Sequence, residues 1–164
     1  MKVLVVDDDV SVRESVSKVL RDEGYDAVLA ADGTEALRQF LTQEIDLLVL
    51  DLGLPIKSGW DVFEQITTEN PLVPIIIITG QADQYRVAVA AGVGALMEKP
   101  LDVMQLLHTI RDLLTEPKEV RLHRLCGHGG NVRHVPASNA QFLKHLREQY
   151  EKPYQFKLPH PHQF

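Results

Sequence analysis

Five short runs of apolar, largely β-branched residues recur along the first hundred residues and predict the strands of a sheet. They span residues 3–6, 26–31, 46–50, 74–79 and 94–97. The runs at 46–50 and 74–79 are almost continuously apolar, so both faces of these strands are expected to be covered. This is typical of central strands in a parallel sheet.

Apolar residues between these runs recur at the helical period. Helices are expected over residues 10–21, near 36–41, over 59–68, over 83–91 and from residue 102 onward. The clearest apolar stripes are Val12, Val16, Val19 and Leu20, and Leu106, Leu107, Ile110, Leu113 and Leu114. Five strand–helix units predict an α/β domain over residues 1–116, with a five-stranded, doubly wound parallel sheet.

Polar side chains stand at the carboxyl ends of four predicted strands: Asp7 with Asp8, Asp51, Thr79 and Lys99. Open parallel sheets bind ligands outside these ends, where strand order reverses, so we expect the five side chains to share one pocket. Two carboxylates about 4 Å apart repel by about 4 kcal/mol at an effective dielectric near 20. Either one acid therefore holds a proton or a cation lies among them. An all-oxygen set favours a hard cation such as Mg²⁺.

Four motifs at these strand ends resemble the response-regulator receiver family of two-component signal transduction in order, type and spacing. They are VLVVDDD (3–9), DLLVLDLGLP (46–55), IIIITG (75–80) and EKP (98–100). One such motif would be weak evidence, but four in the family's order make a chance match remote. The resemblance covers about residues 2–115 and implies the flavodoxin-like receiver fold.

The resemblance implies a phosphorylation site centred on Asp51. This carboxylate would attack the phosphohistidine of a histidine kinase or a histidine phosphotransfer protein and become an aspartyl phosphate. Lys99 would contact the phosphoryl oxygens, and Thr79 would move as a switch residue to hydrogen-bond them. The peptide bond before Pro100 is expected to be cis. The chain would then be a phosphoacceptor signalling domain and not an enzyme with a separate substrate.

The resemblance also implies a Mg²⁺ site. Asp8 and Asp51 would ligate the ion directly, together with the backbone carbonyl of Gly53, and Asp7 would act through the ion's water shell. From the residues alone, the three acids at 7–9 could instead cap the following helix, because carboxylates favour the positive helix end. Asp9 is expected to do only this.

Two features depart from the family's pattern. The second switch position, three residues before Lys99, usually holds an aromatic residue, but here it is Leu96. The usual coupling between an aromatic ring and Thr79 is therefore in question, whereas the phosphorylation chemistry is not. Gly53 and Gln81 flank the expected path of hydrolytic water, and Gly53 offers no side chain to shield it.

Composition and charge restrict the expected cellular location and the expected partners. No apolar run approaches the ~20 residues that span a bilayer, and the start lacks the long apolar region of a signal peptide, so no membrane and a cytoplasmic location are expected. The single cysteine, Cys126, excludes an intramolecular disulfide and fits a reducing compartment. Residues 1–116 carry 9 Lys and Arg against 20 Asp and Glu, a net charge of −11 that disfavours DNA binding by this part.

Residues 117–164 form a basic, His-rich C-terminal extension. They carry 8 Lys and Arg against 3 Asp and Glu, a net charge of +5, and six of the seven histidines. The favoured interpretation is an extension that leans on the acidic body. One helix is predicted near residues 138–150, and its apolar stripe is expected to cover the body, a second subunit or a partner. The stripe comprises Phe142, Leu143, Leu146 and Tyr150.

Four residues of the extension raise the question of a zinc site: His123, Cys126, His128 and His134. Structural zinc sites usually hold at least two cysteines, and this segment has one. The four residues are therefore expected to be ordinary loop residues.

Two functions compete. The first is a response regulator whose output passes through protein–protein contact with an unidentified target, with a homodimer as one option for its assembly. The second is a transcriptional regulator that uses the basic extension on DNA. It is less favoured because the 138–150 helix offers only Lys144 and Arg147. A non-phosphorylated scaffold conflicts with the intact polar set, and a phosphatase would need a second acid where Gly53 stands.

Overall fold

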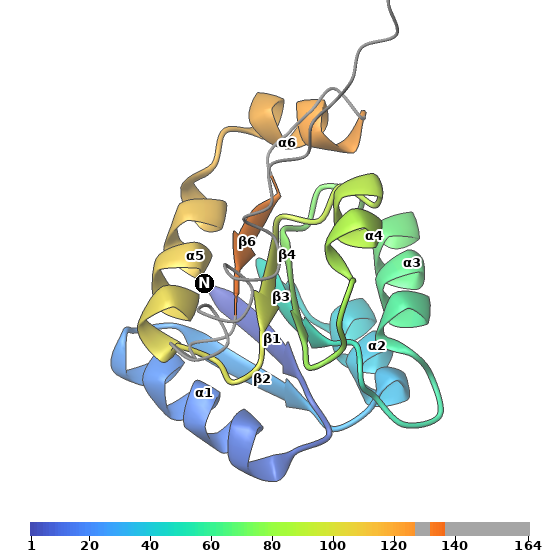
Figure 1. Cartoon of the computed structure of the whole chain (residues 1–164). Helices are drawn as coiled ribbons and strands as arrows, with labels where there is room; N and C mark the ends of the chain where they lie inside the picture. The colour runs from blue at the N-terminus through green and yellow to red at the C-terminus, as the bar shows by residue number, and fades with distance from the viewer. Residues whose placement is uncertain (127–131, 137–164) are drawn as a thin grey trace, which may run out of the picture.

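Strands and helices alternate along the computed structural model, which describes residues 1–126 and 132–136 (Figure 1). The strands are β1 (Lys2–Val6), β2 (Asp26–Ala30), β3 (Leu47–Asp51), β4 (Ile75–Thr79), β5 (Ala95–Glu98) and β6 (Arg133–Val135). The helices are α1 (Val10–Asp22), α2 (Gly33–Thr42), α3 (Gly59–Glu69), α4 (Tyr85–Ala90), α5 (Val103–Thr115) and α6 (Lys118–Leu125). None of these helices is long and apolar enough to cross a membrane.

The strands form one parallel sheet in the order β2-β1-β3-β4-β5-β6. The order reverses between β1 and β3, because the chain first adds β2 on one side of β1 and then returns to add β3 on the other. A doubly wound sheet has its ligand site beside such a reversal. The predicted α/β class and parallel arrangement are confirmed.

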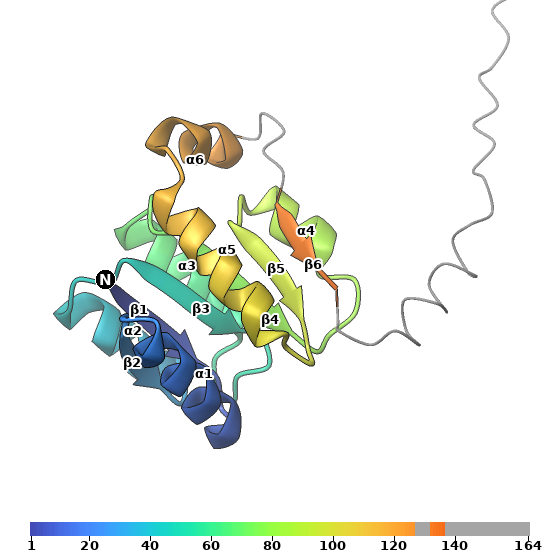
Figure 2. The same ribbon diagram turned by 90° about the vertical axis from the view of Figure 1, so that its left-hand side faces the viewer.

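Each face of the sheet carries its own hydrophobic core, as the continuously apolar strands predict. Leu4, Leu48 and Ile77 pack on one face with residues of α2, α3 and α4. Val49 and Ile76 pack on the other face with residues of α1 and α5. Figures 1 and 2 show the sheet between these two helical layers. Side chains alternate between the two faces along each strand, so every strand residue of β3 is buried.

The extension contributes to the sheet, which the sequence did not predict. The expected five strands are six, because residues 133–135 pair in parallel with β5. Residues 118–125 form α6, so His123 and His134 lie in regular structure and not in loops. The reason is that β6 has only three residues, one of them apolar, and α6 is short and largely polar, so neither gives a strong apolar pattern. The helix predicted near 138–150 lies outside the described residues.

Charged contacts fix α6 to the body. Arg124 is buried and donates to both carboxylate oxygens of Glu116, at 2.6 and 2.7 Å. Arg121 donates to the carbonyls of Leu72 and Leu113 at 2.7 and 2.8 Å. Burial raises the pKa of Glu116, but the hydrogen bonds and charges of Arg124 and Arg121 outweigh it and hold the pKa below 4.5.

Gly59 allows α3 to begin directly against the end of β3. A Cβ at this position would lie 2.3 Å from the carbonyl oxygen of Asp51 and 2.7 Å from the Cα of Leu52. Both neighbours are backbone atoms, which cannot rotate away. A side chain here therefore displaces the backbone that carries Asp51.

We expect Gly59→Ala to lower the free energy of unfolding by about 1–3 kcal/mol, because overpacking forces a backbone shift. Urea denaturation of the purified variant measures this change. Gly80→Ala is the matched control, since a Cβ at Gly80 meets no atom within 4 Å. Equal stability of Gly59→Ala and wild type would contradict the close approach.

Glu116→Gln should lower stability near neutral pH by about 1–3 kcal/mol, because a hydrogen-bonded charge is lost. Since the folded pKa of Glu116 lies below 4.5, its contribution is complete above that pH and disappears as pH falls through the folded value. Urea melts near pH 7 and near pH 3.5 should therefore show the gap to wild type closing in acid. The exposed Glu119→Gln serves as the control, and a gap that stays constant with pH would refute the assignment.

Candidate functional site

The predicted polar residues meet at the carboxyl edge of the sheet. Asp7 and Asp8 follow β1, Asp51 and Thr79 end β3 and β4, and Lys99 follows β5. The structure gathers the three acids and Lys99 into one cluster, while Thr79 lies at the end of β4, between β3 and β5. The cluster flanks the reversal between β1 and β3, where a ligand site is expected.

Lys99 bridges two buried carboxylates. Its Nζ lies 2.8 Å from Oδ2 of Asp7 and 2.6 Å from Oδ2 of Asp51. Desolvation lowers the pKa of Lys99, but the hydrogen bonds and charges of Asp51 and Asp7 outweigh it and raise that pKa. Burial raises the pKa of Asp7, and Lys99 only partly offsets this effect. The ammonium group is therefore charged, and it makes two carboxylates compatible with one buried space.

Backbone amides hold the same two carboxylates from the other side. Oδ1 of Asp7 accepts from the amide of Asp9 at 2.9 Å, and Oδ1 of Asp51 accepts from the amide of Gly53 at 2.9 Å. Each carboxylate thus binds Lys99 through one oxygen and the amide two residues further along through the other. This matched arrangement restrains the orientation of both carboxylates.

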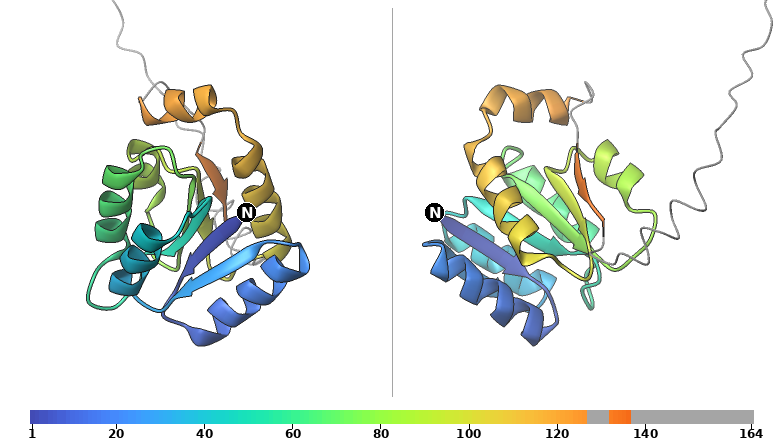
Figure 3. Two further views of the ribbon diagram at one scale, coloured as in Figure 1. Left: turned by 180° about the vertical axis from the view of Figure 1, so that it is seen from behind. Right: turned by 60° about the vertical axis from the view of Figure 1, so that its left-hand side comes forward.

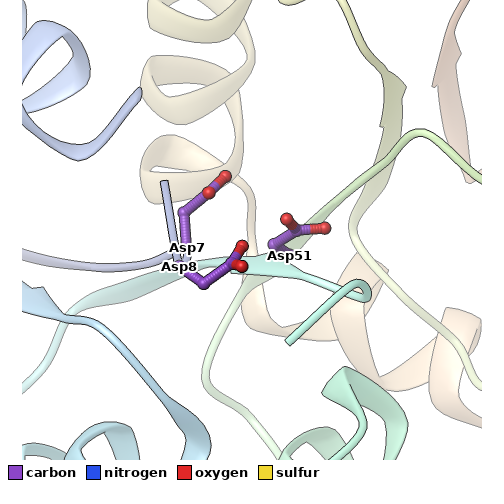
Figure 4. Close-up of side chains that lie close together, drawn as sticks. All are labelled: Asp7, Asp8 and Asp51. Carbon is purple, nitrogen blue, oxygen red and sulfur yellow. The ribbon is translucent and has the colours of Figure 1, made fainter. Parts of the chain in front are cut away.

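Asp8 completes an acidic triad and is exposed to solvent. One carboxylate oxygen from each of Asp7, Asp8 and Asp51 lies within 4.8 Å of the others (Figure 4). Within the described ranges, this is the one group of three or more acidic, His or Cys residues so arranged. Three carboxylates face one lysine here, so the cluster keeps a negative charge, and its all-oxygen donors fit Mg²⁺.

Residues at the rim of the cluster occupy defined positions. Thr79 is buried, and its hydroxyl accepts from the amide of Gln81 at 2.9 Å. Gly53 places no side chain beside the Asp51 carboxylate, although a Cβ there would make only ordinary contact with it, at 3.5 Å. The Lys99–Pro100 bond is cis, as the resemblance implies. Leu96 is buried in the core beneath α4.

Two residues near the acids support the loop that carries them. Asp9 caps α1 by accepting from the amides of Ser11 and Val12, as expected. Arg13 was not anticipated: its Nη1 donates to the backbone carbonyl of Asp7 at 2.5 Å. A cation in the first turn of a helix opposes the helix dipole, and that exception is the signal that could have marked it.

A family model described as the response regulator receiver domain matches residues 3–111. The probable transcriptional regulatory protein TcrX of Mycobacterium tuberculosis is 38% identical over 114 residues, which cover 68% of this chain and 49% of that protein. The transcriptional regulatory protein DltR of Streptococcus agalactiae is 33% identical over 135 residues, which cover 81% of this chain and 59% of that protein. The chain thus spans about half to three fifths of these relatives.

Solved structures of receiver domains have a similar fold. A CheY-like receiver domain protein from Methanospirillum hungatei has a TM-score of 0.67 at 30% identity, covering 72% of this chain and 95% of that one. The response regulator TrrA from Thermotoga maritima, solved with Mg²⁺ and BeF, has a TM-score of 0.64 at 28% identity, covering 68% and 97%. The family model ends at residue 111, so it covers the strand-end cluster and not β6.

Asp8→Asn should weaken Mg²⁺ binding at least about tenfold, because it removes one of the three charges that attract the ion. Isothermal titration with MgCl₂ measures this affinity. Asp9→Asn is the matched control: it is the adjacent exposed acid, and asparagine caps a helix as well as aspartate does. If both variants bind Mg²⁺ like wild type, the triad is not the metal site.

Proposed function

Because the chain belongs to the response regulator receiver domain family, we propose that it is a phosphorylation-controlled signalling protein whose acceptor is Asp51. The phosphoryl group comes from a phosphohistidine on a histidine kinase or a phosphotransfer protein. The carboxylate of Asp51, held between the Lys99 ammonium and the Gly53 amide, is the observation that supports this role. The proposal includes a cytoplasmic location and no separate enzymatic substrate.

The proposed step is an in-line displacement at phosphorus. A carboxylate oxygen of Asp51 forms a bond to phosphorus as the bond from phosphorus to the imidazole nitrogen breaks, and the nitrogen leaves with the electron pair. Lys99 stays within reach of the transferred oxygens and offsets their charge. Thr79 ends the neighbouring strand, and its hydroxyl can donate to the phosphoryl group. Such catalysis depends mostly on positioning and on charge neutralisation.

The acidic triad supports a role for Mg²⁺ in this step. When bound, Mg²⁺ neutralises the charge that accumulates between the carboxylates and the phosphoryl oxygens. Asp8 and Asp51 would hold it with the Gly53 carbonyl, and Asp7 would orient its water shell. Lys99 contributes a fixed positive charge between Asp7 and Asp51. Asp7 itself is fully buried and already bonded to Lys99, which suits an orienting role better than direct attack.

For the output we propose protein–protein contact. Three cations of the extension are engaged with the body: Arg121 and Arg124 with Glu116, and Arg133 with Asp112. Arg121 and Arg124, which are largely buried in these contacts, are not available to a phosphate backbone. The contacts support the interpretation in which the extension leans on the acidic body, at least as far as Pro136.

DNA binding is the second candidate, because relatives such as TcrX and DltR carry names of transcriptional regulators. This chain covers about half of their length, so similarity alone does not assign their output to it. DNA binding through the basic extension would show as an affinity that falls steeply with salt concentration.

Acetyl phosphate with Mg²⁺ should raise the intact mass of the wild-type chain by one phosphoryl group. Asp51→Asn should abolish this change. Lys99→Ala should slow it at least about tenfold, since a hydrogen bond to a charged group contributes about 1.5–3 kcal/mol. Intact-mass spectrometry over time follows both.

The exposed Asp22→Asn on α1 is the control and should react like wild type. Asp51→Asn that gains the phosphoryl group at the wild-type rate would place the acceptor elsewhere. Asp51→Asn should unfold at a temperature close to that of the wild type. Its failure to react would then not be due to loss of the fold.

A further inference from the structure

The strand β6 covers the edge of the sheet that β5 would otherwise expose. It pairs with β5 in parallel, with Arg133 opposite Ala95, His134 opposite Leu96 and Val135 opposite Met97. Figure 3 shows β6 as the outermost strand, beside β5. An uncovered strand edge presents unpaired backbone groups and readily accepts another strand. In this chain, residues of its own extension occupy that position.

Side chains of β6 reach elements on both faces of the sheet. On the α5 face, Arg133 forms an ion pair with Asp112. On the α4 face, Nε2 of His134 lies 2.9 Å from Oε1 of Glu98, and its ring centroid lies 5.1 Å from that of Tyr85. The strand is therefore recognised by α4, β5 and α5 together.

Two valines anchor the ends of this segment in the two cores. Val132 is 4% exposed and belongs to the core beneath α4, which also contains Leu96 and Ala88. Val135 packs against the opposite core, beside α5. The seat on β5 thus fits an extended segment of defined order: apolar, basic, His and apolar.

The remaining contacts are shallow. The side chains of Arg133 and Asp112 are 46% and 53% exposed, and those of His134 and Glu98 are 34% and 29% exposed. Exposed ion pairs add little stability, and β6 is only three residues long. Residues 132–136 are held mainly by Val132 and by backbone pairing with β5. Release of this segment from β5 would therefore remove only one buried side chain from the core.

We propose that the edge of β5, with α4 and α5, is a strand-accepting docking surface, and that residues 132–136 occupy it as a displaceable cover in cis. A partner that adds an extended basic segment to β5 must first displace this cover. The cover decides access by competition, since the apparent affinity of an incoming strand falls with the fraction of time the seat is closed.

The covered strand also connects with the strand-end cluster. Glu98, the partner of His134, lies opposite Thr79 in the β4–β5 register and directly precedes Lys99. A shift of Lys99 on phosphorylation would move Glu98 and so change its contact with His134 on β6. By linkage, displacement of residues 132–136 would change the affinity of Asp51 for the phosphoryl group. This link rests on the proposed function, whereas the docking surface itself does not.

The test uses the full chain and a capped peptide, Val-Arg-His-Val-Pro, that copies residues 132–136. Val132→Asp should open the cover and raise amide exchange along β5 at least about tenfold. Val132→Ala, a milder truncation of the same anchor, is the second variant, for the case that Val132→Asp does not fold. Arg111→Glu is the matched control, because it breaks an exposed α5 ion pair, with Glu23, that lies away from β6.

NMR titration should place the peptide on β5 and α4 in the opened variant, at least about tenfold more tightly than in wild type or Arg111→Glu. Equal affinity for wild type and the opened variant would overturn the cover. Absence of peptide binding to a variant whose β5 amides exchange rapidly would overturn the docking surface. Wild-type dimers that dissociate in Val132→Asp would overturn the cis assignment, because a second copy would then supply β6. None of these outcomes depends on whether Asp51 accepts a phosphoryl group.

Discussion

The ammonium group of Lys99 between two buried carboxylates is the interaction on which the site depends. Asp7 and Asp51 come from β1 and β3, and they could not share a buried space as two uncompensated charges. The parallel sheet makes the arrangement possible by bringing the carboxyl ends of β1, β3, β4 and β5 to one edge. The result is a carboxylate with a fixed orientation, a cation beside it and two further acids that give the cluster a surplus of negative charge.

Much of this was predictable, because the signals are local. The apolar runs of β3 and β4 are buried on both faces. A polar residue that ends such a strand is therefore expected at the edge of the sheet, where polar side chains can find partners. Asp51, Thr79 and Lys99 could therefore be placed together from the sequence. A cation in the first turn of α1 could have marked Arg13, but its partner, the Asp7 carbonyl, could not be predicted because it depends on how α1 packs against β1.

The extension marks the limit of prediction. The segment at 133–135 has no strand period of its own, and it is a strand because β5, α4 and α5 each offer it a partner. Such contacts join residues far apart in the chain, and they override local propensity. Leu96, where the family's pattern has an aromatic residue, lies opposite His134, whose ring meets that of Tyr85. Aromatic groups are thus present at this edge of the sheet, but they come from α4 and from the extension. The helix predicted near 138–150 stays a prediction.

Chemical location of the phosphoryl group tests the central claim most directly. Borohydride reduces an aspartyl phosphate to the alcohol, which converts the modified aspartate to homoserine. After reaction with acetyl phosphate and Mg²⁺, reduction and proteolysis, tandem mass spectrometry should find homoserine at position 51. Homoserine at Asp7, Asp8 or any other position, with aspartate intact at 51, would contradict the account.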